Sequence, residues 1–205
     1  MTAIAGYRTA ILAILDDPSL ARYTNDQVDA ALRQALRLYA GFRPIIRTYI
    51  VDGSDTFQIT MPADFLAVQV LSVHLVNTDY DPPKEIAFYA TLIDEQWTIE
   101  TRDYKVAATE SISVEYSISH TVDGLDSAAG TTVPEEDELA VQMSAAGYCC
   151  LSRAASRTET INLQPDVAAG LINLGVHLLD EFAKFIHSRP SVTISVPPDM
   201  VSDDF

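Results

Sequence analysis

The sequence predicts an α+β protein that is mainly an antiparallel four-helix bundle, with a small antiparallel β domain inserted into it and an extended C-terminal arm. Apolar residues recur at helical spacing over residues 1–44 and 132–188, whereas strand-like alternation occupies residues 45–122. Arg189 and Pro190 then end the last helical pattern, and a strand-like stretch with two prolines follows. We therefore expect a discontinuous helical domain (1–44 and 132–188), an inserted β domain (45–122) and an arm (189–205).

The most clearly marked element is a helix between Thr24 and Pro44. Thr24 and Gln27 form a capping-box pattern, in which each side chain binds a free backbone N–H at the start of the helix. Gly41 is expected to take the left-handed conformation just after the last turn, and Pro44 prevents continuation. One apolar face follows spacings of three and four residues: Val28, Ala31, Leu32, Ala35, Leu36 and Tyr39.

Three more helices are expected, over residues 3–15, 134–154 and 167–187. The helix that begins near Pro134 opens with four acidic residues, which we expect to be solvated and to complement the positive end of the helix dipole. They are Glu135, Glu136, Asp137 and Glu138. The Ala and Gly residues of this helix predict close packing against another helix.

Short strands are expected over residues 45–51, 56–60, 66–76, 85–89, 96–100, 104–107 and 110–120. The last of them alternates most regularly, with Ile112, Val114, Tyr116 and Ile118 facing one way. Strands of this length and spacing indicate an antiparallel sandwich or barrel.

The charge of the chain is strongly acidic and unevenly distributed. The formal net charge is −16, which argues against general affinity for nucleic acid or acidic lipid. Residues 1–47 nevertheless hold 6 basic and 4 acidic residues. Arg33, Arg37, Arg43 and Arg47 follow one another along this region, and they are candidates for contact with an acidic protein surface or with phosphate. They are equally well explained as ordinary solvated arginines.

Motifs for catalysis, cofactors and metals are missing, so we expect a protein that is not an enzyme and has no cofactor. The adjacent Cys149 and Cys150 point in different directions on a helix and are expected to be reduced. His74 and His120, on alternating strands, are more simply interpreted as solvated or core residues than as ligands. Two acidic pairs, Asp94-Glu95 and Asp123 with Asp126, have too few ligands for a calcium loop, and the second is expected to be a turn.

The C-terminal arm alternates at Val192, Ile194 and Val196 and reaches Phe205 after two prolines. It is expected to add an edge strand either to its own sheet or to the sheet of a partner, and the partner is favoured. These four residues, together with the arginines, are the expected partner-binding residues. The apolar segment 167–179 is too short to span a bilayer, so no membrane contact is expected.

Segments of the chain resemble a known family. A short first helix, the turn Asp16-Asp17-Pro18, the step Arg22-Tyr23-Thr24 and the helix to Pro44 resemble the N-terminal module of head–tail connector (adaptor) proteins of tailed bacteriophages. The order of elements after it is similar to that family as well. The resemblance implies a structural virion protein of the neck, made in the host cytoplasm and assembled as a twelve-fold ring. Such a ring docks on the portal protein, extends the DNA channel without specific DNA binding, and offers a surface to tail or neck proteins.

Two other functions compete with this interpretation. Trp97, Tyr89 and Tyr104 lie in the predicted β domain, and grouped on an exposed face they would form the aromatic platform of a ligand- or carbohydrate-binding module. A small hydrolase that uses the carboxylates Asp94, Glu95, Asp123 and Asp126 is the third candidate.

Overall fold

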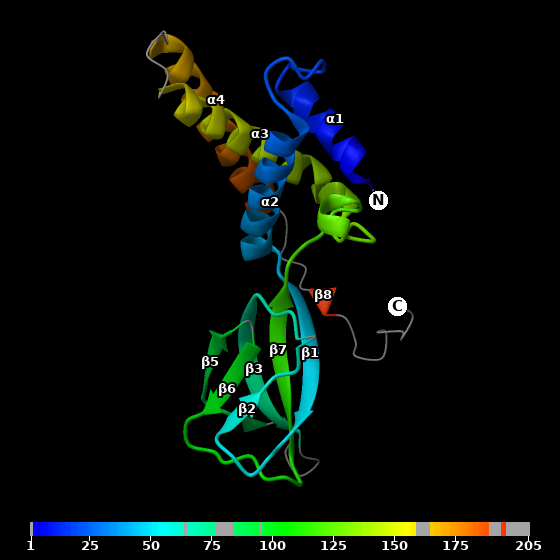
Figure 1. Cartoon of the computed structure of the whole chain (residues 1–205), viewed down its shortest axis with the longest axis vertical. Helices are drawn as coiled ribbons and strands as arrows, with labels where there is room; N and C mark the ends of the chain where they lie inside the picture. Colours follow the sequence, from blue (N-terminus) through cyan, green and yellow to red (C-terminus); the bar gives the residue numbers. More distant parts are fainter. Residues whose placement is uncertain are drawn as a thin grey trace. The chain divides into compact units, whose positions relative to one another are not determined.

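The computed structural model describes residues 2–63, 65–76, 84–94, 96–158, 165–188 and 194–195. The chain forms two compact units (Figure 1). The helical unit comprises residues 1–43 and 120–192, and the β unit comprises residues 44–119 and 193–205. The β unit is thus inserted into the chain of the helical unit.

The helical unit contains α1 (Ile4–Ile14), α2 (Asn25–Phe42), α3 (Glu135–Thr158) and α4 (Pro165–His187). Helix α3 is the central element, because α1, α2 and α4 all pack against it. The capping box at the start of α2 is confirmed: Thr24 Oγ1 accepts from the Gln27 backbone N–H, and Gln27 Oε1 accepts from the Thr24 N–H. The predicted apolar face of α2 is buried in the core of this unit.

The predicted end of α2 is wrong in one detail. Gly41 lies inside the helix, which continues to Phe42, and the Arg43 N–H still donates to the Tyr39 carbonyl at 2.9 Å. Pro44 is the residue that stops the helix, since a proline disfavours the helical conformation of the residue before it. Arg43 accordingly has φ −134° and ψ 68°.

The acidic start of α3 also differs from expectation, because two of its four acids are buried. Asp137 accepts a hydrogen bond of 2.7 Å from the Tyr39 hydroxyl. Glu138 accepts from the Thr2 backbone N–H at 3.0 Å and from the Thr2 hydroxyl at 2.6 Å. These carboxylates fasten α2 and the N-terminal segment to α3. The helix also runs to Thr158, beyond the predicted end.

Helices α3 and α4 approach each other at two glycines, as the Ala and Gly content of α3 predicts. A Cβ placed on Gly147 would lie 3.0 Å from the Gly175 carbonyl oxygen, and a Cβ on Gly175 would lie 3.0 Å from the Gly147 carbonyl oxygen. Only residues without a side chain allow the two backbones this close.

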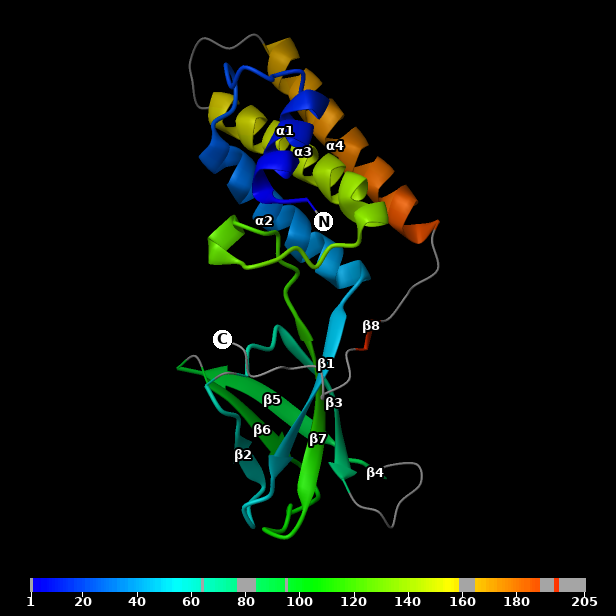
Figure 2. The same ribbon diagram turned by 90° about the vertical axis from the view of Figure 1, so that its right-hand side faces the viewer.

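The β unit consists of two sheets that share one core (Figure 2). The larger sheet has the order β4-β3-β7-β1-β8 and the smaller has the order β2-β6-β5. Neighbouring strands are antiparallel except for β8, which runs parallel to β1. The strands are β1 (Ile45–Asp52), β2 (Gln58–Thr60), β3 (Gln69–Val76), β4 (Lys84–Glu85), β5 (Phe88–Ile93), β6 (Gln96–Thr101), β7 (Ser111–Ile118) and β8 (Ile194–Ser195).

The core of the β unit lies between these sheets. Ile112, Val114 and Tyr116 of β7 are buried on one face, as predicted, and they meet Ile59 and Ile99 of the smaller sheet in one cluster. The strand expected over residues 104–107 does not form; that segment contributes one isolated bridge, Thr56 with Val106.

The predicted fold class therefore needs correction. Over the described residues the fold is α+β, with four helices and seven strands in two antiparallel sheets, plus the short parallel β8. A four-helix bundle with a small β insertion is the wrong description, because the helices are arranged around α3 and the β unit has a core of its own. Strand alternation identifies one buried face per strand. The two sheets around one core correspond to the sandwich of the two predicted alternatives, sandwich or barrel.

Candidate functional site

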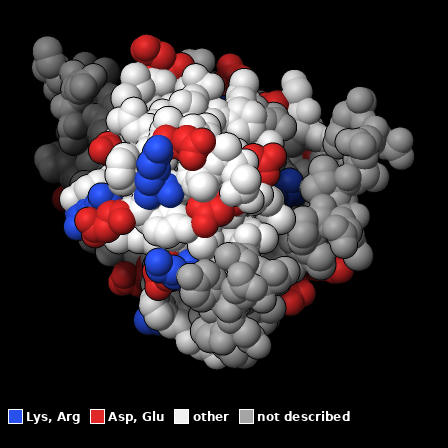
Figure 3. Space-filling view, turned by 90° about the horizontal axis from the view of Figure 1, so that it is seen from below, with Lys and Arg blue, Asp and Glu red and all other residues white. Residues whose placement is uncertain are grey.

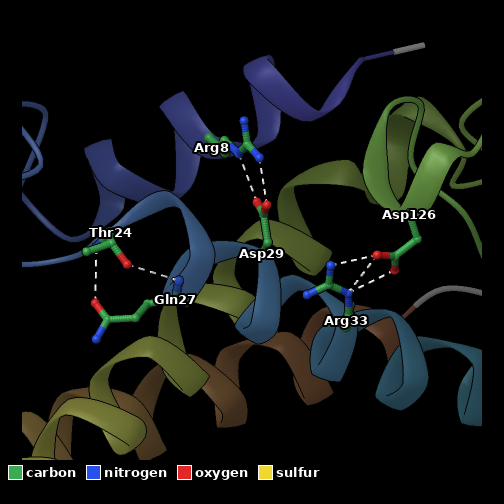
Figure 4. Close-up of polar contacts among 6 residues, drawn as sticks. All are labelled: Arg8, Thr24, Gln27, Asp29, Arg33 and Asp126. Carbon is green, nitrogen blue, oxygen red and sulfur yellow. Dashed lines mark hydrogen bonds and ion pairs between the residues drawn. The ribbon is translucent and has the colours of Figure 1, made fainter.

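Arg33 of the predicted arginine group is already paired within the chain (Figure 4). Its Nε and Nη2 donate to both carboxylate oxygens of Asp126, with distances of 2.8 and 2.6 Å for the shortest pair of bonds. Arg8 binds Asp29 in the same two-pronged manner and joins α1 to α2. The Arg33 pair lowers the pKa of the Asp126 carboxyl and fixes the turn in which Asp126 lies.

Arg33 and Arg37 lie one turn apart on α2, whereas Arg43 follows the end of that helix and Arg47 lies in the β unit. Arg37 is exposed on α2, whereas Arg43 is buried and its Nη2 donates to the Ile186 carbonyl at 3.4 Å. Arg47 belongs to β1 and therefore to the β unit, where it is half-buried opposite Tyr116. Within the helical unit, the Arg37 side chain is exposed, and the Arg33 side chain is 41% exposed but held in its pair with Asp126.

His120 and His74 have separate partners. The His120 Nε2 is 2.6 Å from the Arg43 carbonyl oxygen and therefore donates to it, while Nδ1 is 3.2 Å from the Thr132 hydroxyl. Burial lowers the pKa of His120, although both hydrogen bonds act in the opposite direction. His74 Nε2 is 2.9 Å from the Ser72 hydroxyl of the same strand. No two histidines form a ligand pair among these contacts.

The predicted aromatic platform does not form. Tyr89 pairs with Glu100 across the smaller sheet and is 51% exposed, whereas Trp97 pairs with Leu92. Side chains alternate between the two faces along a strand, and Tyr89 and Leu92 are three residues apart on β5. Tyr89 and Leu92 therefore point to opposite faces, and Trp97 lies on the face of its partner Leu92. Trp97 packs against the core and its indole N–H donates to the Ala67 carbonyl at 3.2 Å. Tyr104 donates to Glu110 at 2.6 Å and also packs against that core.

The remaining candidates for chemistry are the two cysteines and the two acidic pairs. Cys149 and Cys150 are free and buried, as predicted, and burial raises the pKa of the Cys149 thiol to about 12. Asp123 and Asp126 lie in a turn, with Gly124 at φ 80°. Glu95 lies outside the described residues. Within the described ranges, no three His, Cys, Asp or Glu side chains are grouped so as to hold a metal ion.

Apolar side chains remain exposed on both units. Helix α4 presents Ile172 and Val176, one turn apart and 43% and 47% exposed; we refer to them as the α4 face.

Strand β5 forms an edge of the smaller sheet, and among the described strands only β6 pairs with it. Its sequence FYATLI has no charge, and Leu92 and Ile93 are 57% and 60% exposed. An uncharged edge strand is open to pairing with another chain.

A cavity of about 330 Å³ lies in the helical unit between the α1–α2 loop, α3 and α4. We call it the Arg22–Arg153 cavity after its two charged residues. Its apolar wall consists of Leu15, Val167, Leu171 and Leu174. Nothing in the spacing of Arg22 and Arg153 indicates that they converge, since 130 residues of chain separate them. The only sequence signal here is the Arg22-Tyr23-Thr24 step.

The loop that carries Arg22 is held by a buried carboxylate. Asp17 accepts hydrogen bonds from the backbone N–H groups of Ala21, Arg22 and Tyr23 at 3.0, 2.8 and 2.9 Å. Desolvation alone would raise the pKa of Asp17, but these donors outweigh it and the pKa lies below its ordinary value. The α1–α2 loop, which forms one side of the cavity, is therefore held in place by hydrogen bonds within the chain.

The described part of the C-terminal arm lies on the chain's own sheet. Ile194 and Ser195 form β8, which pairs with Ile45 and Ile46 of β1. The predicted partner-binding residues Val192, Val196 and Phe205 lie outside the described residues. β8 pairs with the first two residues of β1, and residues 47–52 of β1 continue past the end of β8.

None of the described helices is both long enough and apolar enough to span a membrane. No protein-family model and no curated protein matches this chain.

Proposed function

We propose that this chain is a structural subunit of a head–tail connector ring in a tailed bacteriophage. The ring docks on the portal, extends the DNA channel and presents a surface to tail proteins. The observation that carries the proposal is that both units leave apolar side chains exposed, on the α4 face and on β5, as expected of a subunit built to assemble.

Ring assembly requires two unlike surfaces on each subunit, because neighbours around a ring meet front to back. The α4 face is helical, while β5 offers backbone N–H and C=O groups along an open sheet edge. The two surfaces therefore differ in geometry and in chemistry. This difference supports a heterologous contact over a symmetric pair.

The charge of the chain supports a channel through which DNA slides. A wall with net negative charge offers phosphates no strong basic site on which to stop. The net charge is −16, and in Figure 3 the blue basic side chains lie beside red acidic ones on the face shown. The predicted basic group is reduced by the pairing of Arg33 with Asp126.

The ligand-binding module is less well supported, because Trp97 and Tyr89 point to opposite faces of their sheet. This alternative can be tested directly with glycans. Glycans that bind through an aromatic platform would quench or shift Trp97 fluorescence, and we expect no such change.

The proposal is tested by imaging labelled protein mixed with purified DNA-filled, tailless heads of the virus that encodes it. We expect label at a single vertex of each head, in a ring. Ile172→Asp with Val176→Asp should abolish the ring, whereas Asn173→Asp, an exposed polar position on the same helix, should not. Label spread over the heads, or none bound, would overturn the proposal.

The arm is tested separately by deleting residues 191–205. We expect weaker ring or portal attachment and an unchanged fold by circular dichroism. Unchanged attachment would remove the arm from the assembly contact.

A further inference from the structure

The Arg22–Arg153 cavity combines an apolar wall with two guanidinium groups, and none of the described residues that line it is acidic. Its volume of about 330 Å³ is at the small end of ligand sites, suited to one or two side chains. Leu174 and Val167 of its wall are 42% and 43% exposed, so the cavity is open to the surface. A ligand that fits must be apolar at one end and acidic at the other.

The guanidinium of Arg153 is positioned but not neutralised by the described residues. It lies 5.1 Å above the Tyr23 ring and donates to the Arg22 carbonyl oxygen. Neither Arg22 nor Arg153 forms an ion pair with a carboxylate in the described ranges. Arg22 also lines the cavity, and its charge acts on the nearby Asp17 carboxylate. Positive groups beside a partly desolvated wall bind carboxylates more strongly than the same groups in open water.

The chain itself contains a segment with these properties. Residues 196–205 read VPPDMVSDDF, with three aspartates, no basic residue and an aromatic side chain next to two of the aspartates. The two residues before this segment, Ile194 and Ser195, pair with β1 as β8. An extended stretch of ten residues spans at most about 35 Å.

We propose that the Arg22–Arg153 cavity receives Asp203-Asp204-Phe205 from a second copy of this chain. The Phe205 ring fills the apolar part of the cavity, and Asp203 and Asp204 pair with Arg22 and Arg153. The segment is the donor and the cavity is the acceptor, so every copy carries both halves of a front-to-back contact. This inference rests on the self-assembly in the proposed function and names one of its contacts.

Peptide binding tests the chemistry of the site. The protein is the full chain with Asp203→Asn, Asp204→Asn and Phe205→Ala, which leaves the cavity without its own donor. The probe is a fluorescein-labelled peptide of residues 196–205, followed by fluorescence anisotropy. We expect saturable binding that weakens with added salt and falls by about tenfold or more when Arg22→Gln and Arg153→Gln are added.

The controls separate the cavity from general charge effects. Arg37→Gln removes an exposed arginine elsewhere on the helical unit and should leave peptide affinity unchanged. Leu174→Asp, which places an acid in the exposed wall, should weaken binding as strongly as loss of the arginines. Peptides with Phe205→Ala or with both aspartates changed to Asn should bind poorly. Equal affinity of the double arginine variant, or no binding at all, overturns the proposal.

Mixing two full-length variants tests donation between copies. One lacks the donor side chains and the other carries Arg22→Gln with Arg153→Gln. We expect each to be monomeric alone by sedimentation velocity, and their mixture to form dimers through one intact donor and one intact cavity. A mixture that stays monomeric overturns donation by a second copy. Peptide binding with no ring on viral heads would instead overturn the connector function and leave the cavity assignment standing.

Discussion

His120 is the residue at which the chain returns from the β unit to the helical unit. Its imidazole is buried, contacts the Tyr39 ring at a centroid distance of 4.7 Å, and donates to the Arg43 carbonyl. Asp137, on α3, is the nearby carboxylate whose field favours the charged imidazole. The desolvation cost outweighs that field, so the neutral form is favoured in the folded protein.

This burial predicts a pH dependence of stability. Because the pKa of His120 is lower in the folded chain than the ordinary value of about 6.5, the unfolded chain binds the proton more readily. The stabilisation by neutral His120 is complete above that value and is lost as the pH falls toward the folded pKa. We expect the free energy of unfolding to fall between about pH 7 and pH 5, measured by urea titration.

His120→Gln should remove this part of the slope, whereas His177→Gln, at an exposed position on α4, should retain it. An unchanged slope in His120→Gln would assign the pH dependence to other groups.

Tyr39 makes a second residue-level prediction, because its hydroxyl donates to the buried Asp137 carboxylate at 2.7 Å. Tyr39→Phe removes the donor and should lower the free energy of unfolding by about 1.5–3 kcal/mol, the range for hydrogen bonds to charged groups. Tyr148→Phe is the matched control, since no hydrogen bond of its hydroxyl to another described residue is seen, and it should stay within about 0.5 kcal/mol. Equal effects in a denaturant titration would show that the Tyr39 hydrogen bond contributes little.

At the scale of elements, the crossing of α3 and α4 depends on its two glycines. Gly147→Ala would place a Cβ 3.0 Å from the Gly175 carbonyl and 3.1 Å from Leu179 Cγ, so the helices must separate. We expect a loss of about 1–3 kcal/mol. Gly170→Ala on α4 has nothing within 4 Å and should stabilise by up to about 1 kcal/mol, since alanine favours helix. Thermal unfolding of both variants distinguishes the outcomes, and a neutral Gly147→Ala would mean that the crossing adjusts freely.

Local patterns predicted single elements well. The capping box at Thr24, the apolar face of α2 and the buried face of β7 follow from residue spacing, which acts within a few residues. Gly41 misled the prediction because two stop signals lie three residues apart, and the proline is the stronger one. Asp137 and Glu138 were expected to be solvated because their partners, Tyr39 and Thr2, are distant in the sequence.

At the scale of the molecule, the two units have separate cores, and the unfolding of each can be followed by a different spectroscopic signal. Trp97 is the one tryptophan of the chain and lies in the β unit, whereas far-UV circular dichroism is dominated by the helices. Leu32→Ala and Ile112→Ala each truncate a fully buried side chain, one in each core, and each should cost its own unit about 2–5 kcal/mol.

We expect Leu32→Ala to shift mainly the dichroism transition and Ile112→Ala to shift mainly the Trp97 fluorescence transition. If both variants moved both transitions together, the units would unfold as one cooperative block.

Contacts between residues far apart in the sequence could not be predicted from residue spacing. Pairing of Arg33 with Asp126 joins residues 93 positions apart, so the spacing of the arginines did not reveal it. The convergence of Arg22 and Arg153 depends in the same way on how α1, α3 and α4 pack. The opposite orientations of Tyr89 and Trp97 follow from the register of β5 against β6, which the sequence does not show.

The strands through which the chain leaves and re-enters the helical unit are direct neighbours, since Ile45 of β1 pairs with Ile118 of β7. A segment whose two ends lie side by side can be cut out and its stubs rejoined by a short turn, with little change to the host. Residues 44–119 of the β unit therefore have the end-to-end geometry of a replaceable insertion. Another β domain joined at the same two positions would leave the helices their own core.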